Sequence, residues 1–136
     1  MIYLDTHVVI WLYGDATRKL SKTAARLIRD NDVFISPMVK LELQYLYEIE
    51  RIASSPKKIL DYLASKKSQL QVCQKSFSLV TEEALKITWT RDAFDRLIVA
   101  HASVDNNILL TKDKKILANY SYAVWDKYPE EKANTQ

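Results

Sequence analysis

Short apolar runs alternate with helical segments along the whole of this sequence, and that alternation restricts the possible folds more than any other feature. Runs rich in branched and aromatic residues occur at 2–5, 32–36 and 107–111, with weaker candidates at 72–74 and 123–126. Parallel strands need crossover connections of about a dozen residues or more, and these connections put helices on both faces of the sheet. We therefore predict an α/β fold: a three-layer α/β/α sandwich with a central parallel sheet.

Helix start and stop signals occur in the segments between these runs. The helix after Asp5 is expected to end near Gly14, which is the only glycine in the chain. Serine is a favoured N-cap and proline is favoured at the first helical position. The helices expected from these signals begin after Ser21, at Ser36-Pro37 and at Ser55-Pro56, and two more are expected at about 81–87 and 93–104.

One of these helices has a conspicuous apolar pattern. Leu41, Tyr45, Ile49 and Ile52 follow Pro37 at helical spacing. Their apolar side chains offer area for a partner protein, but we expect most of them to be buried in the core.

Composition is consistent with one folded domain. The chain has 136 residues, of which 48% are hydrophobic and 27% charged, and its formal net charge is +3. These values are typical of globular proteins, and the length suits one domain, which we place at 1–127 with a frayed tail at 128–136. A single cysteine, Cys73, cannot form an internal disulfide. No apolar run approaches the ~20 residues of a membrane span, so we expect a cytoplasmic protein without membrane contact.

Acidic residues follow the strand-like runs. Asp5 ends the first run, Asp113 comes just after the run at 107–111, and Glu42 lies in the second turn of the helix that begins at Pro37. Asp92 and Asp95 lie at the start of the helix at 93–104. Each of them has a local explanation, as a helix cap, a first-turn acid or a turn residue.

Together, these acids suggest a shared site. Ligands of parallel sheets bind beyond the carboxyl ends of the strands, which is where the acids are expected to converge. Converging carboxylates raise one another's pKa unless a positive charge lies between them. Hard oxygen ligands without a Cys/His set favour Mg²⁺ or Mn²⁺ over Zn²⁺. The sequence therefore predicts a divalent metal site.

Four blocks of this sequence resemble the PIN-domain ribonucleases, specifically the VapC-type toxins of bacterial type II toxin–antitoxin pairs. The blocks are MIYLDTHVVIW, SPMVKLEL, RDAFDRLIVAHA and LLTKD, and the resemblance extends from Met1 to about Trp125. It implies a PIN-like fold and a metal-dependent endoribonuclease that hydrolyses RNA phosphodiesters. By this resemblance the acidic quartet of the site is Asp5, Glu42, Asp95 and Asp113, while Asp92 has an auxiliary role.

Metal-assisted phosphodiester hydrolysis gives each acid a role. One or two ions would activate a water and neutralise charge on the leaving oxygen, so no side-chain nucleophile is needed. We expect Asp5 and Asp95 to be the principal ligands and Asp113 to serve a second or water-mediated contact. Glu42 would position or deprotonate the attacking water.

Other polar and aromatic residues have local explanations beside functional ones. Thr6 and Thr111 could hydrogen-bond the ligand carboxylates, and Arg96 could contact substrate phosphate or pair with a neighbouring acid. Lys112, beside Asp113, could attract RNA at the mouth of the site. Residues expected to pack or cap rather than act on substrate are His7, His101, Trp11, Trp89 and Trp125.

The resemblance also implies partners. Toxins of this family are held inactive by a cognate antitoxin and commonly form homodimers, so we expect both here in addition to an RNA substrate. The alternative is a catalytically inert or RNA-processing PIN-like domain that binds RNA or protein without acting as a toxin.

Overall fold

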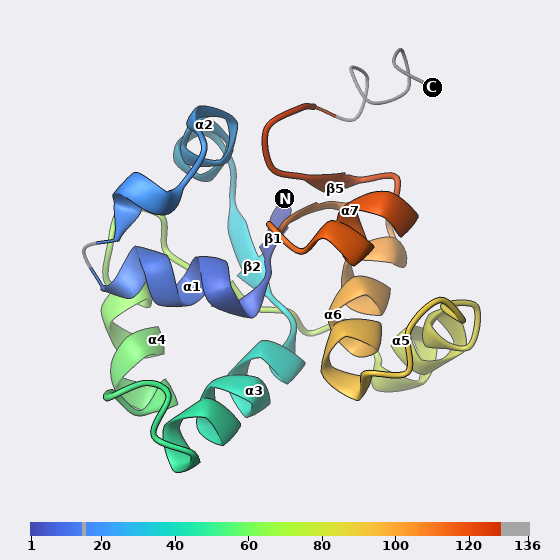
Figure 1. Cartoon of the computed structure of the whole chain (residues 1–136), viewed down its shortest axis with the longest axis horizontal. Coiled ribbons are helices and arrows are strands. Elements are labelled where there is room, and N and C mark those ends of the chain that lie inside the picture. Colours follow the sequence, from blue (N-terminus) through green and yellow to red (C-terminus); the bar gives the residue numbers. More distant parts are fainter. Residues whose placement is uncertain (15, 129–136) are drawn as a thin grey trace.

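A five-stranded parallel sheet forms the centre of the computed structural model, which describes residues 1–14 and 16–128 (Figure 1). The strand order is β3-β2-β1-β4-β5, and all four pairings are parallel. Ile2 of β1 pairs with Val33 of β2 on one side and with Ile108 of β4 on the other. The strands are β1 (Ile2–Leu4), β2 (Val33–Ile35), β3 (Gln71–Val72), β4 (Ile108–Leu110) and β5 (Ala123–Val124).

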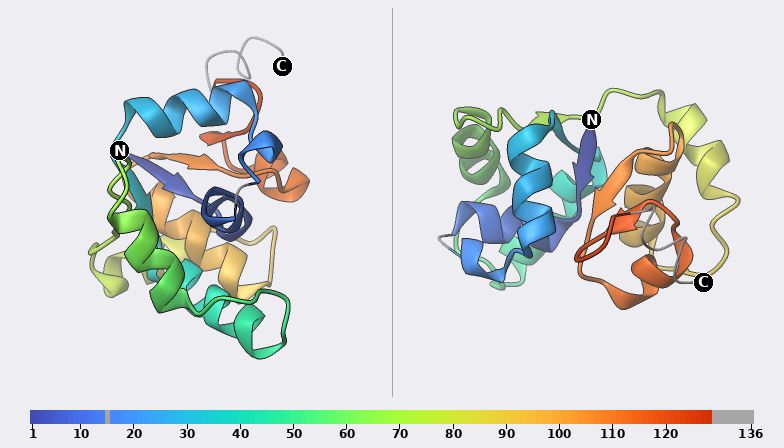
Figure 2. Two further views of the ribbon diagram at one scale, coloured as in Figure 1. Left: turned by 90° about the vertical axis from the view of Figure 1, so that its left-hand side faces the viewer. Right: turned by 90° about the horizontal axis from the view of Figure 1, so that it is seen from above.

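Helices lie on both sides of this sheet, with α2 on one side and α6 on the other (Figure 2). This arrangement confirms the predicted α/β class with a central parallel sheet. The helices are α1 (Thr6–Tyr13), α2 (Lys22–Asp30), α3 (Pro37–Glu48), α4 (Pro56–Ala64), α5 (Phe77–Ala84), α6 (Ala93–Ser103) and α7 (Lys114–Asn119), with a short 3-10 helix, η1 (Thr17–Lys19).

The helix starts follow the capping chemistry of the sequence. Ser21, Ser36 and Ser55 are the N-caps of α2, α3 and α4, and their hydroxyls accept backbone N–H bonds of 2.9, 3.0 and 3.3 Å. Gly14 ends α1, and its N–H donates to the Ile10 carbonyl at 3.0 Å. These caps fix where each helix begins relative to the strand before it, and therefore where the acids lie.

The core is formed by the strands and by one face of each large helix. Leu4, Ile35 and Leu110 of the sheet are fully buried, as are Val8 of α1 and Ile98 of α6. His101 is also buried, as expected, and its Nδ1 lies 2.8 Å from the Ser36 hydroxyl and 2.9 Å from the Leu97 carbonyl oxygen. Burial lowers the pKa of this imidazole, which favours its neutral form.

Two expectations for the helices are wrong. On α3 the buried residues are Val39 and Leu43, whereas Leu41, Tyr45 and Ile49 are 54%, 49% and 44% exposed. The helix also ends at Glu48, before Ile52. Both apolar series on α3 have helical spacing, and spacing alone does not tell which one faces the sheet.

The second error is the position of α5, which begins at Phe77 rather than near 81 and ends at Ala84. The N-cap of α5 is Ser76, a residue type that favours helix starts, although its side chain makes no hydrogen bond to the helix. In the predicted tail, Tyr128 packs partly buried against the core, and 129–136 lie outside the described residues.

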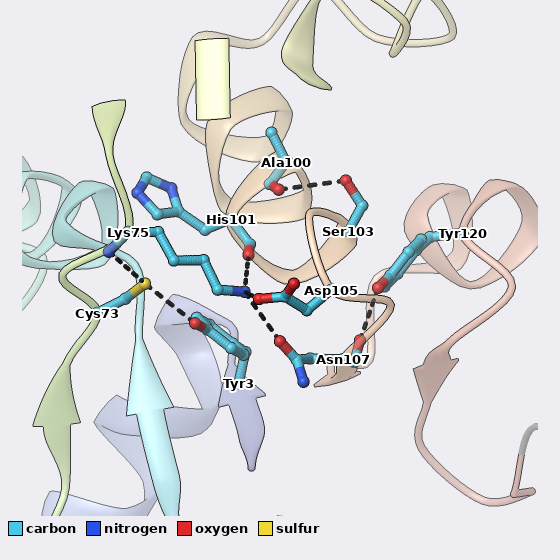
Figure 3. Close-up of polar contacts among 9 residues, drawn as sticks. All are labelled: Tyr3, Cys73, Lys75, Ala100, His101, Ser103, Asp105, Asn107 and Tyr120. Carbon is cyan, nitrogen blue, oxygen red and sulfur yellow. Dashed lines mark hydrogen bonds and ion pairs between the residues drawn. The ribbon is translucent and has the colours of Figure 1, made fainter. Parts of the chain in front are cut away.

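A lysine ties three elements together on the flank of the sheet (Figure 3). The Lys75 ammonium donates to the His101 carbonyl of α6 at 2.9 Å and to the Asn107 side-chain oxygen at 2.9 Å, and it pairs with Asp105 at 3.1 Å. It also lies 4.8 Å from the centre of the Tyr3 ring. We call Lys75 and these four partners the Lys75 cluster. It joins the segment after β3 to the end of α6 and the turn before β4.

Nearby, the only cysteine has a polar partner. Cys73 is buried, and its sulfur accepts a hydrogen bond from the Tyr3 hydroxyl at 3.0 Å. Burial, followed by this contact, raises the pKa of Tyr3, so the phenol stays protonated. Within the described part of the chain, no helix is both long and apolar enough to cross a membrane.

Candidate active site

Asp5 joins β1 to α1 and is both a helix cap and a nearly buried acid, 8% exposed. Its Oδ1 accepts the Thr6 N–H at 2.8 Å, and its Oδ2 accepts the Thr111 hydroxyl at 2.6 Å. Burial raises the pKa of Asp5, and these two hydrogen bonds oppose the rise. The capping explanation is therefore correct, but it uses one oxygen and leaves the carboxylate at the edge of the sheet.

Glu42 approaches Asp5 from α3, the helix that follows β2. It is half-buried, and the Thr6 hydroxyl donates to its Oε1. Burial raises the pKa of Glu42, and the nearby charges of Asp5 and Asp92 add to the rise. Thr6 thus lies between two acids, with its N–H on Asp5 and its hydroxyl on Glu42.

Asp92 and Asp95 reach the same place from the start of α6. Asp92 is the N-cap of that helix, and its Oδ1 accepts the Asp95 N–H at 3.1 Å. Asp95 is half-buried, and its pKa is raised to about 7 by burial first and then by the charges of the four other acids: Asp5, Asp92, Asp113 and Glu42. The pKa of this carboxyl is therefore near neutral because the group is half-buried and also lies among like charges.

Asp113 completes the group from the far side, where it is the exposed N-cap of α7. Its Oδ1 accepts the N–H groups of Lys115 at 2.9 Å and Ile116 at 3.0 Å. Its own N–H donates to the Thr111 hydroxyl at 3.0 Å. Thr111 is fully buried and so links two acids, since it donates to Asp5 and accepts from Asp113.

All five acids line one open pocket of about 420 Å³ at the carboxyl edge of the sheet. The other lining residues are His7, Val8, Trp11 and Lys112. Among residues 1–14 and 16–128, none of the ion pairs involves a lining acid. The pocket therefore concentrates negative charge, and exposed Lys112, which also lines it, forms no ion pair with these acids.

The carboxylates surround a shared space and do not already meet at one point. In the described residues, no three His, Cys, Asp or Glu side chains form a ready-made metal site. This does not conflict with a magnesium-type site, because Mg²⁺ keeps several waters and is held through one or two carboxylates. The candidate metal ligands are all carboxylate oxygens, whose negative charges repel each other. This set fits a hard divalent cation.

The other residues singled out from sequence fall into two groups. Thr6, Thr111 and Lys112 lie at the pocket or hydrogen-bond its acids, as expected for supporting residues. Arg96 is turned away, because its Nε donates to the Ala84 carbonyl at the end of α5, at 2.9 Å. That bond joins α5 to α6, and Arg96 does not contribute to the pocket lining.

His7 and Trp11 of α1 line the pocket beside the acids, a position that was not predicted from the sequence. Trp11 also packs partly buried against the core, as expected. A signal for the pocket position was present, because residues four apart on a helix share a face, and both follow Asp5 closely. Trp125 is buried, as expected, and Trp89 packs partly buried against the core.

The fold and the site define an α/β protein with an acidic pocket at the carboxyl edge of its parallel sheet. The PIN domain family model matches residues 2–121, so the chain belongs to the PIN domain family. PIN domains are generally nucleases.

A solved structure is similar in fold. One chain of the crystal structure of VapBC2 from Rickettsia felis bound to a DNA fragment from their promoter has a TM-score of 0.62 and 23% identity. The alignment covers 87% of this chain and 92% of that chain. A search of curated proteins finds no significant match.

Proposed function

We propose that this chain is a metal-dependent endoribonuclease and the toxin of a toxin–antitoxin pair, acting in the cytoplasm. The observation that carries the proposal is that carboxylates from four separate elements line one pocket without an ion-pair partner among the described residues. Burial, together with the charges of the neighbouring acids, raises the pKa of Asp95 to about 7, and groups with strongly shifted pKa values cluster at functional sites.

Each acid of the pocket has a role in this proposal. Asp5 and Asp95 would hold Mg²⁺ or Mn²⁺, with Asp113 at a second or water-mediated position. When bound, the ion would activate water and stabilise negative charge on the phosphate. Glu42 would orient the attacking water and accept its proton, which its raised pKa favours.

The two threonines would keep the carboxylates in place. Thr111 fixes Asp5 relative to Asp113, and Thr6 fixes Glu42 relative to Asp5. Neighbours that orient ligands in this way commonly change metal affinity or activity by about 10–100-fold when they are removed. Asp92 would act indirectly, through its charge and its cap of α6.

The partners proposed are a cognate antitoxin and a second copy of the chain. The similar Rickettsia felis structure is a VapBC2 complex, which supports an antitoxin partner. A basic side chain of that partner would be attracted by the acidic pocket. Exposed apolar side chains on α3, such as Leu41 and Tyr45, and on α5, such as Phe77 and Leu79, offer area for the second copy.

An inert PIN-like module that binds RNA or protein is the second candidate. It is favoured by the lack of a ready-made three-ligand metal site in the described residues. Its weakness is that a module without metal gains nothing from acids that repel phosphate.

The deciding experiment is cleavage of end-labelled total RNA by the purified protein with Mg²⁺ or Mn²⁺. We expect discrete products that disappear with EDTA and in Asp5→Asn. Asp61→Asn is the matched control, because Asp61 is an exposed acid on α4 outside the pocket, and it should cut normally. Cleavage that persists in EDTA, or full activity of Asp5→Asn, would contradict the proposal.

A further inference from the structure

One wall of the acidic pocket is aromatic. Trp11 of α1 lines the pocket while remaining half-buried, unlike Trp125, which is buried beneath it. The two indoles meet edge to face, with ring centres 5.7 Å apart and planes at 62°. Trp11 is therefore held by a buried neighbour while part of it faces the pocket, which makes it a rigid surface.

A second ring extends this wall. His7 lies one turn before Trp11 on the same helix face, is exposed, and also lines the pocket. The centres of the two rings are 6.3 Å apart, and the ring planes are tilted by 50° relative to each other. The wall thus offers two adjacent π surfaces at the mouth of the site.

Positive charges border the same wall. The Lys19 ammonium lies 5.8 Å from the centre of the Trp11 ring, and exposed Lys112 lines the pocket. Lys19 is exposed, so its ammonium can turn toward a phosphate without breaking a buried contact. Aromatic faces beside mobile cations are the combination that binds single-stranded nucleic acid, through base stacking and phosphate contacts.

We propose that Trp11, with His7 beside it, is the stacking platform for a nucleobase of the single-stranded RNA that enters the acidic pocket. This inference rests on the proposed nuclease function and adds a substrate contact to it. Bases in a duplex are paired and stacked on each other, so such a platform selects unpaired RNA, such as loops and single-stranded ends. Stacking tolerates any base, so it would give affinity and strand selection without a sequence code.

The test measures binding apart from cleavage. All variants are made in the Asp5→Asn background, and fluorescence anisotropy follows a short labelled single-stranded RNA in the presence of Mg²⁺. Trp11→Leu keeps an apolar side chain against Trp125 but removes the π face, and we expect it to weaken binding about 10-fold or more. Trp11→Phe should stay within about 3-fold of the parent, because it keeps an aromatic face.

A matched control and an altered ligand exclude a general structural effect. Tyr62 is also exposed and has a lysine, Lys66, 4.4 Å from its ring centre, but it lies outside the acidic pocket. Tyr62→Leu should therefore bind like the parent. With an RNA chain made of abasic nucleotides, Trp11→Leu and its parent should bind equally, because no base remains to stack.

Three results would overturn the inference: unchanged RNA binding in Trp11→Leu, an equal loss on the abasic chain, or no binding of RNA by the parent. If Trp11→Leu does not fold, the wild-type protein is photocrosslinked to RNA carrying 4-thiouridine. Crosslinks on Trp11 or His7 support the platform, and crosslinks found solely elsewhere overturn it. Gels of wild-type samples with Mg²⁺ show separately whether RNA is cut, so failure of the nuclease proposal is seen independently.

Discussion

Charged side chains have opposite surroundings in the acidic pocket and in the Lys75 cluster. In the Lys75 cluster, one ammonium with a 14% exposed side chain meets a carboxylate, a carbonyl, an amide oxygen and an aromatic ring (Figure 3). In the pocket, several carboxylates face one another, and the ion pairs of the described residues include none of them.

The difference separates a stabilising region from a functional one. A partly buried charge that is fully hydrogen-bonded holds elements together, whereas like charges held close destabilise a fold. Proteins break such local rules mainly where function requires it. Variants that change one region at a time separate the two effects.

Glu42→Gln changes the pocket with almost no change in shape, and we expect the largest effect from it. RNA cleavage should fall by about 100-fold or more, because the amide does not accept a proton from water. Single-turnover cleavage rates measure this loss. Glu48→Gln, on the exposed end of the same helix, is the control and should cut normally. A Glu42→Gln rate within a few-fold of wild type would remove Glu42 from the mechanism.

Lys75→Met removes the central ammonium of the Lys75 cluster. The free energy of unfolding should fall by about 2–3 kcal/mol, because Asp105, Asn107 and the His101 carbonyl lose their shared donor. Urea denaturation measures the change, and the folded variant should still cut RNA. Lys57→Met is the control, since it breaks an exposed pair with Asp61 and should leave the free energy of unfolding almost unchanged. Equal losses in both variants would show that the Lys75 cluster is an ordinary surface contact.

Thr111→Val tests how the pocket is braced, and its effect should be smaller. It removes the donor to Asp5 and the acceptor for the Asp113 N–H with little change in volume. We expect Mn²⁺ affinity to fall by about 10-fold, measured by calorimetric titration. Thr81→Val alters an exposed hydroxyl that donates to the Phe77 carbonyl of α5, and it should leave that affinity unchanged.

Asp95→Asn should reduce the charge repulsion among the pocket acids and make the metal-free protein more stable. The Asp95 pKa is about 7 in the folded state, against 3.8 ordinarily, so the folded state binds more protons between these values. The free energy of unfolding therefore falls as pH rises from about 4 to about 7, and the destabilisation by Asp95 is at its full size above pH 7. In EDTA at pH 8 the variant should be more stable than wild type by about 1–2 kcal/mol, allowing for partial exposure.

Thermal unfolding from pH 4 to 8 measures this difference. The gain in Asp95→Asn should be much smaller at pH 4, where the carboxyl is protonated in the folded state and only partly ionised in the unfolded state. A gain of the same size at both pH values would mean that charge repulsion is not its cause.

Much of the site follows from the sequence because strands and acids are adjacent along the chain. Asp5 comes directly after an apolar run, and Asp113 follows another, so parallel strands bring them to one edge. The sequence did not predict which face of α3 is buried, because Val39 and Leu43 have the same spacing as the exposed Leu41 and Tyr45. Tertiary packing decides between such faces.

Long-range side-chain contacts were also beyond the sequence. Nothing near Lys75 in the chain indicates that Asp105 and Asn107 will meet it. Similarly, Trp11 was expected to lie in the core because it stands in the apolar run from Val8 to Leu12, and the open pocket shows that part of it faces the acids. Such features depend on how the helices pack, which local patterns do not specify.

The most direct test of the central claim, that the crowded carboxylates hold a divalent cation, is Mn²⁺ binding measured by electron paramagnetic resonance at pH 7.5. Saturable binding of one or two ions per chain is predicted, weakened by at least about 10-fold in Asp5→Asn and Asp95→Asn but not in Asp61→Asn. No binding, or equal binding by wild type and both pocket variants, would contradict the account.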